Sequence, residues 1–541
     1  MKKPIIIFLS FIMLLSVFSG CSTKGENNEM TLDGSETTTA PITNPIPVAK
    51  FDGWVSNGYE KVESDAKKPK RSGTDIELYM AKNEKEGFNV SIRCEEAIEG
   101  LNLVLASGNT DGFGIEIFNE YLIPTKFRDY PDGLVPYYDG FNVDAGVTKT
   151  HLIRFSTDES TKAGEYSFKF ELRSAGGDVL QEYNAKVKVW DFALPKTLTS
   201  DGITGLDKRM IIAKEKINGP KGGTYYRMYY EMLLQYGFST YDLPYDILDE
   251  RADAYMSDPR VSAFTVPHDE TDEKILQYYE KLKTNSDWLS KAMFYPYDEP
   301  ANAEHFAIIT ERCERLRELC PDIRIIIPFF LNVKVDNSTD EVDFLSKYVD
   351  LWCPKSACFK EGWLADPLNK GFFGDRMKEE KAGGDTIWWY VCWEPRNPFC
   401  NLQINESGLN HTKLFWQQYL YGVEGILFWA GTYWHETENP WTDMETIKSI
   451  SREIYGDGSL LYPGNYVGVE GPVASLRLEC ARNGMEDYDL LLIAEELLGQ
   501  DWVTEQVKKV TKNMTQHTTD AEEFEAVRKA IGDAIENAYN K

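Results

Sequence analysis

The spacing of apolar residues changes near residue 195, and this change limits the possible folds more than any other feature of the sequence. Before it, apolar and polar residues alternate, as in the segment 166–172, where Tyr, Phe, Phe and Leu are separated by Ser, Lys and Glu. A period of two residues is typical of strands with one buried face. Similar runs lie at 76–80, 88–93, 101–106, 114–118, 151–156 and 185–190, separated by turn residues. We therefore expect an N-terminal β-sandwich over residues 49–197.

After residue 200, helical stretches alternate with short apolar runs. The helical stretches include 225–236, 273–282 and 303–319, and the apolar runs lie at 261–266, 292–297, 323–330, 349–353, 386–392 and 425–429. Strands that alternate with helices indicate βα units and a parallel sheet. These runs, with room for two more strands near 201–206 and 236–241, predict a central (β/α)8 TIM-like barrel over residues 198–455. A doubly wound sheet is the alternative, but no Gly-rich phosphate loop favours it.

The last part of the chain is expected to be helical. Residues 476–498 predict a long helix, and a charged helical tail follows it. We expect residues 456–541 to form a C-terminal helical region that packs on the barrel. The predicted fold class is therefore a multidomain β + α/β protein.

The N-terminus has the features of an export signal. Two lysines precede a nearly continuous apolar run that ends in Ser19-Gly20-Cys21. This ending resembles a lipobox, in which the cysteine is lipidated, although Phe18 stands where leucine is usual. We expect a lipoprotein signal peptide over residues 1–21, with Cys21 as the lipidation site. The alternatives are a plain signal peptide or a membrane span, but the apolar run is shorter than the ~20 residues that a span needs.

Residues 22–48 contain almost no large apolar side chain. Such a segment cannot bury enough surface to offset the entropy lost on ordering, so we expect a flexible spacer. Together with the signal, it predicts a protein anchored to the cell membrane by lipid and facing outward from the cytoplasm.

The charge of the chain excludes some partners. The formal net charge is −29 at pH 7, whereas nucleic acid requires a basic surface, so we expect no nucleic-acid partner. A polyanionic substrate is also disfavoured, although a local basic site could hold one.

Cysteines and histidines give no sign of a metal or cofactor. Apart from Cys21, eight cysteines occur without CxxC spacing, and the six histidines do not have metal-ligand spacing. Cys392 and Cys400 could form a disulfide outside the cell, but buried free thiols are favoured. We expect no cofactor and no metal.

Two acids follow one of the predicted barrel strands. Asp298 and Glu299 come directly after the run 292–297 and before Pro300. Active sites of such barrels lie at the carboxyl ends of the strands. Two close carboxylates cannot both ionise freely, so the pKa of one rises and it can donate a proton near neutral pH. The alternative is a structural role, in which Asp298 caps a helix and Glu299 and Pro300 begin it.

Aromatic residues gather at other predicted strand ends. Nine of the thirteen tryptophans lie between Trp352 and Trp441, and an indole can lie flat against the apolar face of a sugar. Because Trp388 and Trp389 are adjacent, only one can face the barrel interior. The candidate substrate-binding residues are Tyr297, Tyr390, Trp393, Trp429, Tyr433 and Trp434.

Several motifs resemble glycoside hydrolase family 123. In the barrel region they are FYPYDEP at 294–300, WWYVCWEP at 388–395, GILFWAGTYW at 425–434 and SLRLECARNGMEDYD at 475–489. The runs YMAKNEKEGFNVSIR at 79–93 and VWDFALPKT at 189–197 resemble the β-sandwich domain that precedes the catalytic barrel in that family. The motifs occur in matching order over most of the chain.

This resemblance implies an exo-acting β-N-acetylgalactosaminidase that uses the 2-acetamido group of its own substrate. It implies that Glu299 is the general acid/base and that Asp298 orients the acetamido nitrogen. A hydroxyl, from Tyr390 or Tyr433, would hold the acetamido carbonyl. The substrate would be a glycan or oligosaccharide.

Two other functions remain open at this stage. Glu394 does not match the family motif, so it could be the second carboxylate of a glycosidase of other specificity, or an acid in a surface loop. The chain could also be a surface lipoprotein that binds glycans without catalysis, although a binder needs no proton donor such as Glu299.

Overall fold

The computed structural model describes residues 50–540 except 332, 337, 361–372 and 451–452. The predicted signal peptide, Cys21 and the spacer 22–48 therefore lie outside the described residues. Contacts group Ala49–Lys541 as one compact unit. Within the described part of the chain, none of the helices combines the length and the apolar character needed to cross a membrane.

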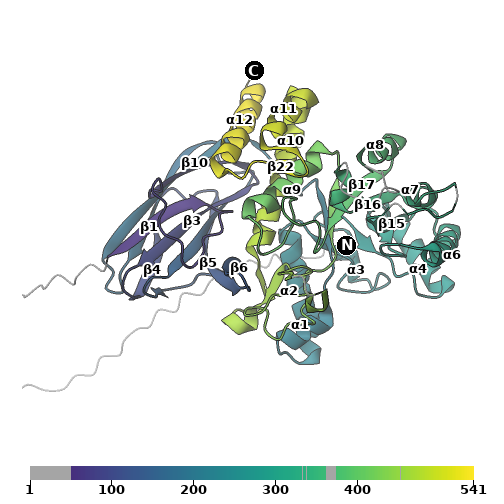
Figure 1. The fold of residues 1–541 in the computed structure, drawn as a ribbon, viewed down its shortest axis with the longest axis horizontal. Helices are drawn as coiled ribbons and strands as arrows, with labels where there is room; N and C mark the ends of the chain where they lie inside the picture. The colour runs from purple at the N-terminus through teal and green to yellow at the C-terminus, as the bar shows by residue number, and fades with distance from the viewer. Residues whose placement is uncertain (1–49, 332, 337, 361–372, 451–452, 541) are drawn as a thin grey trace, which may run out of the picture. The chain divides into compact units, whose positions relative to one another are not determined.

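The first part of this unit consists of two five-stranded sheets (Figure 1). One has the order β1-β3-β8-β5-β6 and the other the order β2-β10-β9-β4-β7. The strands are β1 Phe51–Asn57, β2 Asp75–Lys82, β3 Lys85–Cys94, β4 Ile98–Ser107, β5 Phe113–Pro124, β6 Asp129–Pro136, β7 Phe141–Val143, β8 Thr148–Thr157, β9 Gly164–Arg173 and β10 Val179–Ala193.

The two sheets share an apolar core. Phe88 and Phe155 of the first sheet and Phe168 and Phe170 of the second are buried in one cluster. The rings of Phe88 and Phe170 meet edge to face, with centroids 5.8 Å apart. The alternation in 166–172 therefore places its apolar side chains between the sheets, as expected from the sequence.

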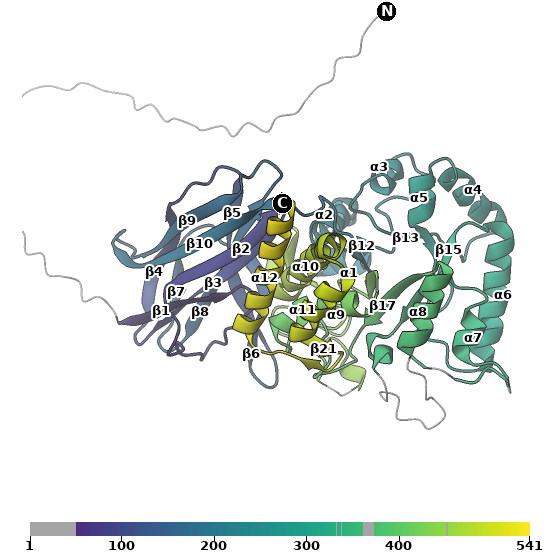
Figure 2. The same ribbon diagram turned by 90° about the horizontal axis from the view of Figure 1, so that it is seen from above.

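Eight parallel strands form the central part of the unit. They are β11 Asp201–Thr204, β12 Ser239–Thr240, β13 Phe264–Thr265, β14 Ala292–Phe294, β15 Arg324–Phe329, β16 Leu351–Pro354, β17 Thr386–Val391 and β18 Gly425–Phe428. Their order is β12-β11-β18-β17-β16-β15-β14-β13. The two outer strands approach each other, because the Thr265 amide donates to the Tyr241 carbonyl at 2.9 Å. The strands thus form a nearly closed barrel, which Figure 2 shows from a second side.

Helices follow most of these strands. They are α1 Lys208–Lys214, α2 Gly222–Gln235, α3 Ala252–Met256, α4 Asp272–Leu282, α5 Ser286–Lys291, α6 Ala303–Leu319, α7 Glu341–Leu345, α8 Phe373–Gly383 and α9 Gly408–Leu420. The C-terminal part holds α10 Leu476–Leu498, α11 Gln500–Val510 and α12 Ala521–Tyr539, with two short hairpins, β19 Leu461–Pro463 with β20 Pro472–Ala474 and β21 Thr511–Asn513 with β22 Gln516–His517.

The C-terminal helices contact both the barrel and the sheets. α10 packs on α9, while α12 packs on β10 (Figure 1). Gly532 makes the second contact possible, because a Cβ at this position would lie 2.2 Å from the Trp190 ring. Within this region α10, α11 and β21 contact the barrel helix α9, whereas α12 covers a sheet.

A buried ion pair joins β6 to α10. The guanidinium of Arg477 lies 2.9 Å from the Asp132 carboxylate, and both side chains are fully buried. Arg477 also donates to the carbonyls of Leu402, Gly456 and Ser459. Because so many donors and acceptors are matched, the charge can be buried between the sheets and the barrel.

The barrel interior is filled by a separate cluster of side chains. It includes Met293, Ile326, Cys353, Trp388 and Tyr390. As expected, the two adjacent tryptophans diverge: Trp388 faces this interior, while Trp389 belongs to the cluster outside it. The eight cysteines of the described residues are buried and free, including Cys392 and Cys400.

Candidate active site

The two candidate acids lie just beyond β14, at the carboxyl ends of the barrel strands. The Glu299 amide donates to the carbonyl of Pro328 on β15 at 3.0 Å, which fixes the backbone between two strands. Glu299 has a φ of 43°, in the left-handed region. A residue other than glycine costs about 1–3 kcal/mol in such a conformation, and such strain gathers at functional sites.

The helix-capping alternative for Asp298 is wrong. Helix α6 begins at Ala303, and its N-cap is Asn302, whose side chain accepts from the amides of Glu304 and His305 at 3.0 and 3.1 Å. Asp298 lies four residues earlier. Capping of α6 therefore does not explain why the two acids lie at this position.

Glu299 is held on one of its two oxygens. The Tyr390 hydroxyl donates to Oε1, and Lys355 Nζ lies 3.7 Å from the same atom. Lys355 comes directly after β16 and is 3% exposed; its ammonium sits 4.0 Å from the Phe330 ring centroid. The Glu299 side chain keeps 36% of its surface exposed, so it can still reach a substrate.

Asp298 has a different environment. The Tyr295 hydroxyl donates to its Oδ1 at 2.8 Å. Burial and the charge of Glu299 raise the pKa of Asp298, while the Tyr295 hydrogen bond and the charge of Lys355 oppose this shift. The adjacent carboxylates thus have separate hydrogen-bond donors from different strands, which allows them different roles.

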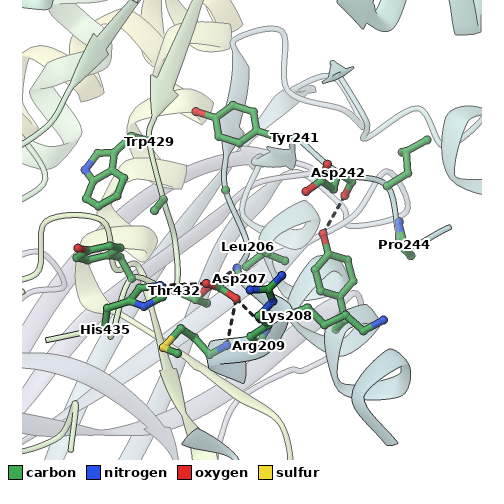
Figure 3. Close-up of a pocket in the computed structure, with 16 residues that line it drawn as sticks. Leu206, Asp207, Lys208, Arg209, Tyr241, Asp242, Pro244, Trp429, Thr432 and His435 are labelled. Atoms are coloured by element: carbon green, nitrogen blue, oxygen red, sulfur yellow. Dashed lines mark hydrogen bonds and ion pairs between the residues drawn. The ribbon is translucent and has the colours of Figure 1, made fainter. Parts of the chain in front are cut away.

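Two cavities lie near the ends of the barrel strands, and neither is lined by Asp298 or Glu299 themselves. The larger has a volume of about 790 Å³ and is lined by the ends of β11, β12 and β18 (Figure 3). The smaller, about 340 Å³, is lined by residues after β12, β13 and β14, among them His268 and Tyr295. Tyr241 lines both, and its ring meets that of Tyr295 edge to face at 5.8 Å. The cavities therefore lie on either side of Tyr241, next to the residue that binds Asp298.

Charged and aromatic side chains share the larger cavity. Asp207 pairs with His435 at 3.0 Å, and Arg209 lies on the same side of the cavity (Figure 3). Trp429 and Tyr433 line it with ring centroids 4.7 Å apart. A cavity with aromatic faces and a few polar groups suits a ligand that has both apolar and hydroxyl surface.

A buried carboxylate fixes the Trp429 ring. The indole N–H donates to Asp457 at 3.1 Å, and Gly458 leaves room for the ring, because a Cβ there would lie 2.4 Å from it. Asp457 is fully buried. Burial raises its pKa to about 7, and the Trp429 hydrogen bond opposes this shift.

The remaining residues that were predicted to line the site differ in how deeply they are buried. Trp434 is fully buried and donates to Ser459 Oγ at 2.8 Å, so it cannot contact a ligand in this structure, and its assignment to the site is corrected to a packing role. Tyr297 packs on His305, with ring centroids 5.2 Å apart, and lies outside the barrel interior. Trp393 is partly buried beside the interior cluster. Glu394 lies in the loop after β17, half-buried.

Four residues near the site, Lys355, Tyr295, Tyr241 and Asp457, were not predicted from the sequence. The first three directly follow barrel strands, so their position was the available signal. Asp457 lies in the loop between β18 and β19, and nothing in the sequence marked it. In the described part of the chain, no group of three or more His, Cys, Asp or Glu side chains could hold a metal ion.

Comparison with known proteins decides the family. Residues 228–494 match the family model of the glycoside hydrolase 123 catalytic domain. The chain belongs to glycoside hydrolase family 123. The chain is therefore a glycoside hydrolase, and a carbohydrate is its substrate.

A solved structure supports the family 123 fold over most of the chain. A family 123 glycoside hydrolase from Clostridium perfringens, studied for glycolipid glycan hydrolysis, matches with a TM-score of 0.65 and 11% identity, over 91% of this chain and 98% of that one. A GH2 β-galacturonidase from Eisenbergiella tayi matches with a TM-score of only 0.30 and 10% identity, over 74% of this chain and 69% of that one. No curated protein matches the chain.

Proposed function

We propose that this glycoside hydrolase releases β-linked N-acetylhexosamine, of the N-acetylgalactosamine type, by a substrate-assisted retaining mechanism. The observation that carries this proposal is the adjacent pair Asp298 and Glu299 at the end of β14, each bound by a different tyrosine. The motif around them resembles the family's Asp-Glu pair. Trp429 and Tyr433 supply an aromatic surface for a sugar ring.

In this mechanism the acetamido carbonyl oxygen attacks the anomeric carbon as the bond to the leaving oxygen breaks. Glu299 gives its proton to that oxygen, and an oxazolinium-type intermediate forms. Asp298 accepts the acetamido N–H and stabilises the positive charge. Glu299, now a carboxylate, takes a proton from water, which opens the intermediate. Since the nucleophile is tethered to the reacting carbon, the step gains from proximity.

A hydroxyl must hold the acetamido carbonyl, and Tyr390 is a poor choice for it. A tyrosine has one proton to donate, and that of Tyr390 already goes to Glu299. Tyr433 remains a candidate, and Tyr241 is a better one, because it lines both cavities. Burial, and then the neighbouring Cys353 and Asp298, raise the pKa of Tyr241 well above its usual range, which keeps its hydroxyl protonated as a donor.

A panel of aryl β-glycosides tests the substrate and the mechanism. We expect turnover of 2-acetamido substrates and about 10²-fold or greater loss when the acetamido group is replaced by hydroxyl, since the nucleophile is then missing. Equal turnover of both would reject substrate assistance. Tyr241→Phe should lower kcat and kcat/KM together, because the donor acts mainly in the transition state.

The same panel separates the two other functions. In a glycosidase that uses Glu394 as nucleophile, Glu394→Ala would be inactive and rescued by azide, whereas a substrate-assisted enzyme should barely change. Full retention of turnover in the double variant Asp298→Asn, Glu299→Gln would remove the acids from catalysis. Glycan binding without any turnover would support the alternative function, a lipoprotein that binds glycans without catalysis.

We also propose that the protein is anchored to the outer side of the cell membrane through lipid on Cys21. The support is the signal at residues 1–21, which ends in Ser19-Gly20-Cys21. The mature protein should incorporate labelled fatty acid and sediment with membranes, and Cys21→Ala should abolish both. Labelling that survives this change would contradict the proposal.

A further inference from the structure

We infer that Lys355 and Tyr390 act together as positioning residues that direct the catalytic proton of Glu299 onto Oε2. This inference rests on the proposed role of Glu299 as general acid. Both groups lie on the side of Oε1: the Tyr390 hydroxyl makes a hydrogen bond to it, and the Lys355 ammonium forms an ion pair with it at 3.7 Å. Among the described residues, no side chain is seen to hydrogen-bond Oε2.

The chemistry of a carboxylic acid explains how this arrangement selects the oxygen that carries the proton. A protonated carboxyl group has one O–H and one carbonyl oxygen, and the carbonyl oxygen is the better acceptor. With the Tyr390 hydroxyl bound to Oε1 and the Lys355 charge beside it, that oxygen becomes the acceptor and the proton is placed on Oε2. Oε2 is then the atom that can face the leaving oxygen of a substrate, so proton transfer needs no rearrangement of the acid.

Once the proton has left, the same two residues stabilise the product. The Glu299 carboxylate forms beside a fixed ammonium and a hydroxyl donor that are already in place. In the second step, the carboxylate must take a proton back from water, and Oε2 is again the oxygen that neither Tyr390 nor Lys355 contacts. Lys355 and Tyr390 therefore favour both directions of transfer without touching substrate.

The local fold keeps the two donors in register. Lys355 and Tyr390 are backbone neighbours in a parallel bridge that extends the pairing of β16 with β17. Lys355 is 3% and Tyr390 4% exposed. The ammonium also lies 4.0 Å from the Phe330 ring and 5.5 Å from the Tyr390 ring, and these aromatic faces make a buried cation tolerable. Both donors thus approach Glu299 from fixed positions.

A purely structural role does not explain Lys355. A buried charge costs free energy of desolvation, and an apolar side chain of similar volume is often equally stable in its place. Glu299 is partly exposed and can be solvated if its partner is lost. Lys355→Met should therefore fold normally, and its thermal unfolding is the first measurement.

The main experiment compares leaving groups. Tyr390→Phe and Lys355→Met should each lower kcat/KM about 10- to 100-fold for substrates with poor leaving groups, the loss expected for one donor to a charged group. Activated aryl substrates need little protonation and should lose much less. Lys355→Arg, which keeps the charge, should recover part of the loss.

Two matched variants serve as controls. Tyr295→Phe removes the hydroxyl bound to Asp298, and its loss should be similar for all leaving groups. Tyr279 lies on α4, away from the site, and its hydroxyl is bound to the Asp322 carboxylate. Tyr279→Phe removes this hydroxyl and should leave turnover unchanged. The contrast isolates the effect of a donor on Glu299 from that of losing any tyrosine hydroxyl.

The outcomes separate this inference from the proposed function. Glu299→Gln should show the strong leaving-group dependence of a lost acid. If it does, and Tyr390→Phe and Lys355→Met lose equally for all leaving groups, the inference is overturned and the function stands. If Glu299→Gln itself lacks this dependence, both are rejected.

Discussion

Trp429 donates its indole N–H to Asp457, a carboxylate with no exposed surface, over 3.1 Å. The ring that faces the larger cavity is thus fixed from behind by a residue that no ligand can touch. We expect Asp457→Ala to release the ring and raise KM about tenfold with a smaller change in kcat, as for the loss of one hydrogen bond used in positioning. Steady-state kinetics on an aryl 2-acetamido glycoside measure this.

The acceptor rather than the charge is what Trp429 requires. Asp457→Asn keeps an oxygen that can accept from the indole, so its KM should stay within a few-fold of the parent. If Asp457→Asn raised KM as much as Asp457→Ala, the positioning role of the hydrogen bond would be contradicted.

The left-handed backbone of Glu299 should be visible as a cost in stability. A side chain with a Cβ is disfavoured at its φ of 43° by about 1–2 kcal/mol, whereas glycine is not. Glu299→Gly should therefore unfold at a higher denaturant concentration than Glu299→Ala, although both lack the acid. Equal midpoints in guanidinium chloride would show that the site carries no such strain.

Buried carboxyl groups should make the protein less stable as the pH rises. Burial raises the pKa of Glu120 to about 8, and the charge of Lys61 opposes this shift, while Glu60 and Asp132 add to it. In the unfolded chain the pKa is about 4.3. The contribution of Glu120 to stability is therefore complete below pH ~4.3 and is lost as the pH rises to ~8, at up to about 1.4 kcal/mol per pH unit.

Glu120→Gln removes this titration. It should raise the free energy of unfolding at pH 8.5 relative to the parent and change it little at pH 5. Denaturant unfolding at both pH values is the measurement, with Glu165→Gln, an exposed position on β9, as the control. A variant that destabilised equally at both pH values would argue that Glu120 is held as a buried ion.

The ion pair of Asp132 and Arg477 should be costly to break. Asp132→Asn keeps the shape of the side chain but leaves a fully buried guanidinium without its counter-charge. A loss of about 3–5 kcal/mol in the free energy of unfolding is expected. Glu182→Gln, in the exposed pair of Lys169 and Glu182 at 2.9 Å, should cost less than about 1 kcal/mol. Similar losses for the two would place Asp132 in contact with solvent.

Strand positions could be predicted well because the pattern of apolar residues is a local property. All eight barrel strands lie in or beside the predicted runs, including β11 and β12, which were only inferred from the space available. The pair Trp388 and Trp389 was also predictable, since adjacent residues of a strand must face opposite sides. The two acids that the sequence placed after a predicted strand lie in the loop that follows β14.

Contacts across the barrel could not be predicted in the same way. Trp434 and Trp429 both follow β18 in the sequence, yet the Trp434 indole is buried and donates to Ser459. The role of Lys355 depends on its neighbour Tyr390, which is on another strand. Local spacing also left helix capping by Asp298 open as an alternative, whereas Asn302 is the cap and four residues of loop separate the acid from α6. Such facts depend on pairing between strands, which a single sequence does not record.

The strand order has a practical consequence for the expression of truncated forms of this enzyme. The family match begins at residue 228, within α2, whereas β11 ends at Thr204 and pairs with both β12 and β18. A truncation at 228 would remove a strand from the middle of the barrel wall and leave two unpaired edges, which promote aggregation. It would also delete Asp207 and Arg209 from the cavity. A soluble fragment must therefore start upstream of β11, and the bond between Asp132 and Arg477 favours a start near residue 50.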